Sequence, residues 1–558
     1  MRQQYEPSAD RIIALYQQLE DDILSAVIRR ILKMGYVSEA SKHQLEVLQA
    51  AGLLYDDIVQ LIADRTDACT AQVKALFEDA GVQTVEIDNS LHEAAGALPI
   101  DIRQDSSTRQ VLEAGYKKTL GTMQNLVSTT ATQTQTAFIQ ACDRIYMQVS
   151  SGAFSYQEAI MNALRALADT GATVSYPTGH TDRMDVAVRR CVLTGVSQTA
   201  AAVSLQQAED AGCYLMEITA HSGARPDHAK WQGQLVTITG KDAGKIIDGL
   251  RVFTLSEIGY GSGEGFKGWN CRHNWHAHYP GLSTPNYTPE ELKKLDEPCI
   301  SYNGKLYTEY EVSQMQRAQE RRVRAWKRRC VTAQEGMNSA TDEATRATAQ
   351  AEFDRSARYL KSNEAKLKDF CRQTGQGRDR FREQVLGFNK STAQKAVHAA
   401  KKSRLTSGGR SGTIKEKDMF HTKDDPIREI LGSAEQSHPE KVKEMMEYLK
   451  SVHVDVIIRD ENESMGYQPG LSAGKPGQIV LNKQASISAW MHEVQHVKDD
   501  EEAGWSGMRV LYNNDERYRR EKKAYDIEIN FAKQLNLDDV VKQLLVLLDD
   551  ERKRIYNE

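Results

Sequence analysis

Two histidines and a glutamate near the C-terminal end of the chain have the types and spacing of a zinc site. His492 and His496 are four residues apart, so on a helix they project from one face about one turn apart. Imidazoles at this spacing can bind one zinc ion, and Glu493 lies beside them to accept a proton from a metal-bound water. The spacing therefore predicts zinc as a cofactor, His492 and His496 as ligands and Glu493 as the catalytic base. The alternative is a surface helix that carries two incidental histidines.

The flanking sequence predicts the elements that would position these side chains. Ser486 is a suitable N-cap for a helix that bears the motif, and Gly504 is a suitable stop. Val454–Arg459 and Gly477–Leu481 are typical of short strands, and the second could offer its edge to an extended peptide. A further helix is expected at about 514–535, where it could supply a third ligand.

The stretch R-E-K-K-A-Y-D-I-E on this further helix is similar to the E-x-x-A motif of zincins whose third ligand is a glutamate. The resemblance implies Glu521 as the third ligand, with the small Ala524 one turn later allowing close approach. Glu528 and Glu502 remain alternatives.

The stretch that begins H-E-V-Q-H-V-K-D-D-E-E-A-G-W also resembles phage-encoded metallopeptidase-like domains. Together the two resemblances imply a zincin-like α+β domain at 420–558 that acts on a peptide or protein substrate. Candidate substrates are capsid or scaffold proteins during maturation, or a host protein after DNA ejection. A degenerate domain without activity is the alternative.

Length and composition limit the remaining possibilities. At 558 residues the chain predicts several domains, because single cores stop growing well below this size. A net charge of -5 gives no overall attraction to nucleic acid, which disfavours a host nucleic-acid-binding protein. The sequence has no run of eighteen apolar residues, so we expect no membrane span. Its eight scattered cysteines favour reduced thiols over a disulfide framework.

The N-terminal part has the periodicity of long helices. Helices are expected at about 40–64, 67–80, 106–150 and 155–170, and a longer one at 186–212 that could break at Gly195. Thr119–Thr136 has few large apolar residues, so we expect it to be exposed or to face a partner.

A central stretch then concentrates rare residue types. It contains H-S-G-A-R-P-D-H-A-K-W-Q-G-Q and G-W-N-C-R-H, preceded by R-R-C-V-L-T-G-V-S-Q-T-A and followed by S-Y-N-G-K-L-Y-T-E-Y-E. These motifs resemble the phage minor capsid protein family, which is related to the head-morphogenesis proteins of tailed phages. The resemblance covers about 1–400.

The resemblance implies a minor head protein of a tailed phage or prophage, acting in head assembly near the portal or in DNA ejection. Its expected partners are the portal and major capsid proteins, with phage DNA near the portal as a further partner. It would be made in the host bacterial cytoplasm and reside in the virion, in the head interior or beside the portal. The alternative is a phage-delivered metalloprotease effector or toxin whose N-terminal region is a packaging module.

Some relatives carry metal-like cysteine and histidine spacings in the two central motifs. The resemblance therefore implies His228, Cys271 and His273 as a second, structural zinc site, although Asp227 is an alternative to His228 in the first motif. This chain has only one of the cysteines, so a buried cluster of Arg225, His228, Trp231 and Trp269 remains open. A catalytic role is the third possibility.

Downstream, the chain is polar and alternates in charge. We expect one long helix at 309–361 and another at 362–383. A basic run from Arg317 to Arg329 could contact DNA, or it could be the solvated face of a helix.

We therefore predict a mainly α chain with α+β modules. Its expected segments are a helical region at 1–205, a small central α+β module at 206–287, long charged helices at 288–404, a Gly/Ser/Lys-rich linker at 405–419 and the zincin-like domain at 420–558.

Overall fold

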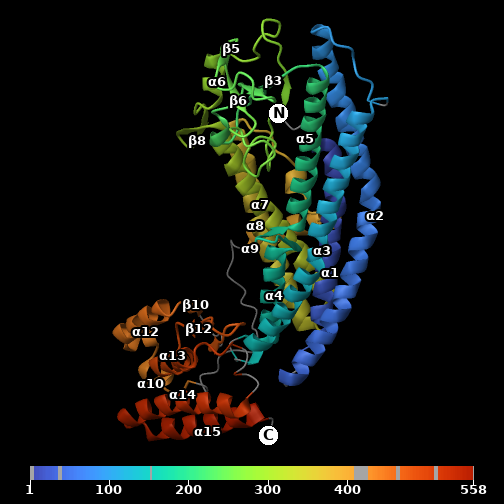
Figure 1. Cartoon of the computed structure of the whole chain (residues 1–558). Helices are drawn as coiled ribbons and strands as arrows, with labels where there is room; N and C mark the ends of the chain where they lie inside the picture. The colour runs from blue at the N-terminus through green and yellow to red at the C-terminus, as the bar shows by residue number, and fades with distance from the viewer. Residues whose placement is uncertain are drawn as a thin grey trace.

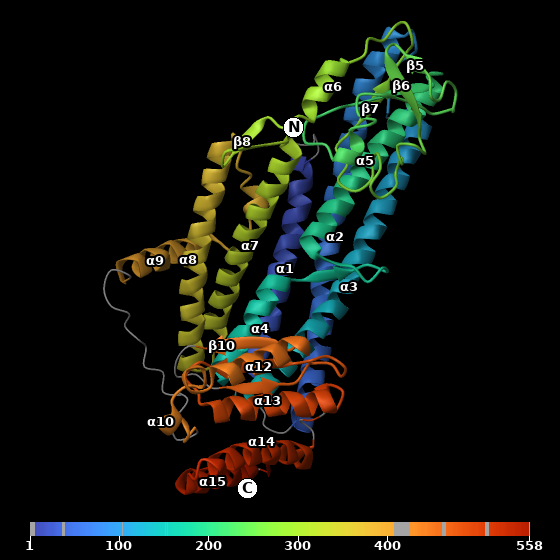
Figure 2. The same cartoon turned by 90° about the vertical axis from the view of Figure 1, so that its left-hand side faces the viewer.

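The computed structural model describes residues 6–35, 40–102, 104–150, 152, 154–406, 425–459, 465–507, 510 and 513–556. It is dominated by long helices that run side by side, with a small sheet module at one end and a separate C-terminal unit at the other (Figures 1 and 2). The predicted mainly α fold with small sheets is confirmed. No helix among the described residues combines the length and the apolar character needed to cross a membrane.

The helical body has two hydrophobic cores, one formed mainly by its first five helices and the other by its last three. Its helices are α1 (Glu6–Met34), α2 (Ala40–Ala94), α3 (Ser106–Ser150), α4 (Tyr156–Thr170), α5 (Met184–Asp210), α7 (Glu309–Ser339), α8 (Glu343–Thr374) and α9 (Lys390–Thr406). The antiparallel pair β1 (Thr173–Ser175) and β2 (Thr181–Arg183) joins α4 to α5. Apolar positions of α1 recur at three and four residues and are fully buried, as in Ile12, Tyr16, Leu19 and Ile23.

The predicted helices at 40–64 and 67–80 are one helix, α2, so the prediction of a break was wrong. No Gly or Pro separates the two predicted helices, so nothing in the sequence interrupts the helix there. Arg65, at the predicted junction, forms an ion pair with Asp22 of α1 (2.9 Å). The predicted boundary at residue 205 falls inside α5.

Thr119–Thr136 alternates between buried and exposed positions, so one face is exposed as predicted and the other packs inside the protein. Thr119, Met123 and Thr130 are among its buried residues, because α3 packs closely against α5. Gly195 does not break α5; a β-carbon there would overlap the Thr119 side chain, so the glycine permits the close approach. Small and β-branched side chains therefore replace large ones at this helix contact.

The charged segment forms a hairpin of two helices rather than one long helix. α7 ends at Ser339, and Asp342 starts α8 by accepting a hydrogen bond from the Thr345 backbone amide (2.8 Å). α8 ends at Thr374, where Gly375 has a φ of 70°, so the expected helix at 362–383 was wrong. The predicted linker begins within the end of α9, and its residues 407–419 lie outside the described residues.

The central module is a five-stranded sheet with the order β5-β6-β4-β3-β7. Its strands are β3 (Leu215–Ile218), β4 (Leu235–Thr237), β5 (Ile246–Ile247), β6 (Leu250–Thr254) and β7 (Trp275–Ala277). Only the pairing of β4 with β6 is parallel. The short helix η1 (Pro226–His228) follows β3, and α6 (Pro289–Leu295) and the hairpin β8 (Ile300–Tyr302) and β9 (Lys305–Tyr307) lead into α7.

The C-terminal unit places helices against a three-stranded sheet. Its elements are α10 (Arg428–Leu431), α11 (Ala434–Ser437), α12 (Pro439–Ser451), β10 (Asp455–Arg459), β11 (Gly466–Gln468), β12 (Gln478–Asn482), α13 (Ile487–Glu502), α14 (Asn514–Gln534) and α15 (Asp538–Tyr556). β12 lies in the middle, parallel to β10 and antiparallel to β11. Residues 478–480 therefore have strand partners on both sides, so β12 has no free edge there for a peptide.

Candidate metal centres

The C-terminal histidines are positioned by helix α13. The Ser486 hydroxyl caps α13 by accepting from the Ala489 backbone amide (3.2 Å), and Trp490 packs in the core under the helix. The histidine face is thereby turned toward α14. The rings of His492 and His496 lie 4.9 Å apart between centroids, as the four-residue spacing predicts.

Glu521 of α14 faces both histidines. Its Oε2 atom lies 3.5 Å from Nε2 of His492 and 3.5 Å from Nε2 of His496. Ligand atoms bound tetrahedrally to zinc are separated by about 3.3–3.5 Å, given Zn–N and Zn–O bonds of about 2.0–2.2 Å. The donor set of two imidazoles and one carboxylate therefore fits a zinc ion with a fourth position left for water.

Glu528, an alternative third ligand from the sequence, instead forms a hydrogen bond with the ligand candidate His492. Its Oε1 atom accepts a hydrogen bond from Nδ1 of His492 (2.8 Å), and its Oε2 atom accepts from the Ser488 hydroxyl (2.8 Å). A neutral His492 ring, which zinc binding requires, would therefore carry its lone pair on Nε2, facing Glu521. Although burial acts in the opposite direction, the Glu521 and Glu528 carboxylates raise the pKa of His492 well above its usual value, so without a metal the ring holds both hydrogens. Glu502 points away: its side chain is 80% exposed, and its nearest ion-pair partner is Lys523 at 3.6 Å.

The ionisable groups of the C-terminal site have shifted pKa values. Although burial acts in the opposite direction, the pKa of Glu521 lies well below its usual value because His496 and His492 surround it. Burial raises the pKa of Glu493, which favours a carboxylate that can hold a proton. Tyr525 meets the His492 ring edge-on at 4.8 Å and closes one side of the site.

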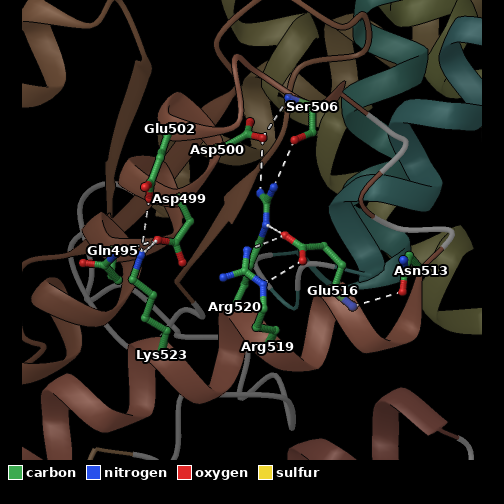
Figure 3. Close-up of polar contacts among 10 residues, drawn as sticks. All are labelled: Gln495, Asp499, Asp500, Glu502, Ser506, Asn513, Glu516, Arg519, Arg520 and Lys523. Atoms are coloured by element: carbon green, nitrogen blue, oxygen red, sulfur yellow. Dashed lines mark hydrogen bonds and ion pairs between the residues drawn. The ribbon is translucent and has the colours of Figure 1, made fainter.

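A network of ion pairs fixes α14 against the end of α13 (Figure 3). Arg520 donates to Asp500 (3.2 Å) and to the Ser506 hydroxyl (3.0 Å), and Lys523 donates to Asp499 (2.5 Å). Arg520 and Asp500 are both buried, so this clamp has little freedom to shift. Because these basic residues flank Glu521 in the sequence, the network sets the position of the carboxylate between the two histidines.

The central module brings together a second group of metal-ligand types. Nδ1 of His228 lies 3.4 Å from Nδ1 of His273, and Sγ of Cys271 lies 3.6 Å from Nδ1 of His273. All three residues are buried. The separations match a tetrahedral zinc ion, for which about 3.3 Å between two nitrogens and about 3.6 Å between nitrogen and sulfur are expected.

The outer nitrogens of both rings have hydrogen-bond acceptors. Nε2 of His228 lies 2.8 Å from the carbonyl oxygen of Glu264, which also accepts from Arg225. Nε2 of His273 donates to Oε1 of Gln232 (3.2 Å). The Gln232 oxygen can only accept, so the hydrogen of the His273 ring sits on Nε2 and its Nδ1 atom carries a lone pair toward the centre. Nε2 of His228 also lies 2.9 Å from Nη2 of Arg225, which can only donate, so the contacts of His228 are compatible with either tautomer. Burial lowers the pKa of His273 to about 2, so its ring is neutral.

The packing around this central cluster differs partly from the predicted one. Trp231 lies against His228 and His273, with ring centroids 4.4 and 4.8 Å apart, but Trp269 is 57% exposed and does not join it. His221, which the sequence analysis did not include, stacks on His273 at 4.4 Å. It lies in the same H-S-G-A-R-P-D-H stretch, so its proximity in sequence to His228 was the available signal.

Comparison with known proteins gives the chain its family. The model of the family described as phage minor capsid protein 2 matches residues 2–372, more than half of the chain. A structural protein of Lactococcus phage LL-H is 25% identical over 334 residues, covering 58% of this chain and 86% of that protein. A structural protein of Lactococcus phage mv4 is 36% identical over 81 residues, which are 14% of this chain and 57% of that protein. No solved structure matches. On the strength of the family match over residues 2–372, the chain belongs to the phage minor capsid protein 2 family.

Proposed function

We propose that this phage minor capsid protein acts in head assembly near the portal or in DNA ejection, and that its C-terminal unit is a zinc metallopeptidase. The family supports a structural role in the virion, because its match spans the helical body and the central module. Portal and major capsid proteins are the proposed partners. The metallopeptidase proposal concerns α13 and α14, which lie outside the family match.

One observation carries the enzymatic part: Glu521 Oε2 lies at equal distance from the two imidazole nitrogens, with Glu493 on the same helix as those imidazoles. His492, His496 and Glu521 would hold the ion. When bound, zinc supplies Lewis acidity toward a carbonyl and lowers the pKa of its water ligand.

The protein's own groups have defined tasks in such a reaction. Glu493 takes a proton from the attacking water and passes it to the leaving amine, a role suited to a carboxyl whose pKa burial raises. Glu528 holds the His492 ring with Nε2 toward the site. A peptide substrate would pair with the outer edge of β10 or β11 rather than with β12, whose central residues are already paired.

Zinc analysis of the purified full-length protein tests the ligand assignment. Glu521→Gln removes a charged ligand and should release one equivalent of zinc. Glu502→Gln is the matched control, because it changes an exposed carboxylate on α13 and should keep the wild-type zinc content. Full wild-type zinc in the Glu521→Gln protein would contradict the proposed site.

Hydrolysis of a fluorogenic peptide mixture tests the reaction separately. Glu493→Gln should keep its zinc but lose at least about a hundredfold in hydrolysis rate, since general-base catalysis contributes on the order of 10²–10⁴. A variant with normal zinc and undiminished hydrolysis would rule out Glu493 as the base.

We also propose a structural zinc ion at His228, Cys271 and His273, favoured by the short distances from His273 Nδ1 to His228 Nδ1 (3.4 Å) and to Cys271 Sγ (3.6 Å) in a buried place. Such an ion would link η1 to the loop before β7 and so hold the central module together. Its ligand cysteine would bind as a thiolate, displacing the thiol proton that burial otherwise favours.

A further inference from the structure

A cavity of about 480 Å³ opens beside the central module, between α1, the first half of α5 and the start of α7. We call it the arginine pocket, after the arginines that line it. These include Arg189 and Arg190 from α5, Arg225 and Arg272 from the central module, and Arg321 and Arg324 from α7. The arginines of α5 and α7 are more than a hundred residues apart in the sequence, and those of the central module lie between them, so the fold brings the three groups together.

The lining of the arginine pocket has an excess of positive charge. Eight arginines face two carboxylates, Asp185 and Glu320. Arg324 donates to Asp185 at 3.0 Å, and Arg317 donates to Glu320 at 2.6 Å, so both carboxylates are already engaged. The pocket therefore has no lining anion left to balance its other guanidinium groups.

Carboxylates outside the lining neutralise this excess only in part. Arg190 pairs with Asp182 (2.7 Å), Arg382 with Asp379 (3.2 Å), Arg189 with Asp10 (3.5 Å) and Arg225 with the half-exposed Asp227 (3.7 Å). Arg321 is exposed and has no ion pair with any residue that the structure describes.

The chemistry of the lining selects the class of ligand. A guanidinium presents a planar fork of N–H donors that matches the oxygens of phosphate and can bind two at once. The cavity volume lies within the range of small-ligand pockets, so a few linked phosphates fit, but a folded macromolecule does not.

We propose that the arginine pocket binds a ligand with two or more linked phosphate groups. The phosphates could belong to a free nucleotide or polyphosphate, or to a short stretch of a nucleic-acid strand that enters the pocket. In either case the phosphates make the contacts, with α5, α7 and the central module each contributing arginines. The site is separate from the C-terminal metal centre, which lies at the opposite end of the helical body (Figure 2).

Two neighbouring arginines of α7 allow a matched test. Arg321 lines the pocket and Arg322 does not, yet both are exposed on the same helix and carry the same charge. Sodium tripolyphosphate is titrated into the full-length protein by isothermal calorimetry at about 0.15 M salt, where long-range attraction is screened. We expect one saturable site in the wild type, nearly unchanged affinity in Arg322→Gln, and roughly tenfold weaker binding in Arg321→Gln.

A second variant and a competition complete the test. Arg321→Gln combined with Arg189→Gln, a pocket arginine of α5, should weaken binding further, and melting curves check that both proteins remain folded. A twelve-nucleotide single strand that competes with tripolyphosphate identifies a strand as a source of the phosphates; competition by ATP alone identifies a free nucleotide. Absence of saturable tripolyphosphate binding, or equal weakening by Arg321→Gln and Arg322→Gln, would overturn the proposal.

Discussion

The Nδ1 atoms of His228 and His273 lie 3.4 Å apart, and the His273 atom carries a lone pair because Nε2 of that ring donates to Gln232. Two buried ring nitrogens at this distance need a proton or a cation between them. The Cys271 thiol, 3.6 Å from His273, can relieve this by donating its hydrogen, or it can ionise and complete a metal site. The two states differ in stability and in metal content, so they can be distinguished.

Cys271→Ser should remove one equivalent of zinc from the full-length protein and leave the equivalent bound by His492 and His496. Serine is a poor zinc ligand, whereas the shape of the side chain is nearly kept. Zinc content by plasma mass spectrometry measures the loss. Cys213→Ser is the control, because Cys213 is buried in the same module but donates to the Leu215 carbonyl instead. Equal zinc contents in Cys271→Ser and the wild type would contradict the structural site.

Glu528→Gln should weaken zinc binding at the C-terminal site without abolishing it. The carboxylate accepts from His492 Nδ1 and from the Ser488 hydroxyl, and it is not itself within the ligand set. Changes to such partners of a ligating histidine lower metal affinity by about 10–100-fold. Competition with a zinc chelator measures the affinity. A loss as complete as that of Glu521→Gln would instead make Glu528 a ligand.

The two metal centres differ in how much of each the sequence could predict. The spacing of His492 and His496 specifies their common face as soon as a helix is assumed, because the helix repeat is fixed. Glu521 depends on how α14 lies across α13, and only its similarity to a known motif pointed to it. The hydrogen bond from His492 to Glu528 had no signal, since it follows from tertiary packing alone.

Tertiary packing also explains the positions at which expectations from the sequence were incomplete or wrong. Trp231 and Trp269 look equivalent as aromatic residues between glycines, yet one is in the core and the other is exposed. Thr119–Thr136 has few large apolar side chains because α5 approaches its buried face closely, while its other face is exposed. The arginine pocket gathers residues from α1, α5, the central module, α7 and residues 381–382, so no local sequence pattern could predict it.

Gly115→Ala should destabilise the helical body. A β-carbon on Gly115 of α3 would overlap the side chain of Thr199 on α5, so one helix must shift. Overpacking of this kind costs about 1–3 kcal/mol. Gly121→Ala on the same helix meets nothing within 4 Å and should stabilise the protein by about 0.5–1 kcal/mol, because alanine favours the helix. Melting temperatures of the two variants should move in opposite directions; a shared direction would mean that the α3–α5 contact is looser than described.

Asp88→Asn should stabilise the protein more at pH 8 than at pH 5. Burial raises the pKa of the Asp88 carboxyl of α2 from its ordinary value of 3.8 to about 6, against the hydrogen bond that Ser204 of α5 donates (2.5 Å). A carboxyl whose pKa is raised on folding stabilises the folded state while it is protonated, and this contribution is lost as the pH rises through about 6. The full shift corresponds to roughly 3 kcal/mol as an upper limit.

Asparagine keeps the acceptor for Ser204 but cannot ionise, so its advantage over aspartate grows with pH. Between pH 5 and pH 8 the difference in unfolding free energy between variant and wild type should widen by roughly 1 kcal/mol. Asp79→Asn is the control, because it removes the same formal charge from an exposed position of α2. Melting temperatures measured at both pH values give the comparison. If Asp88→Asn and Asp79→Asn show the same pH dependence, then the Asp88 carboxyl is hydrated rather than buried between α2 and α5, and the two helices are packed less tightly at that point than the structure describes.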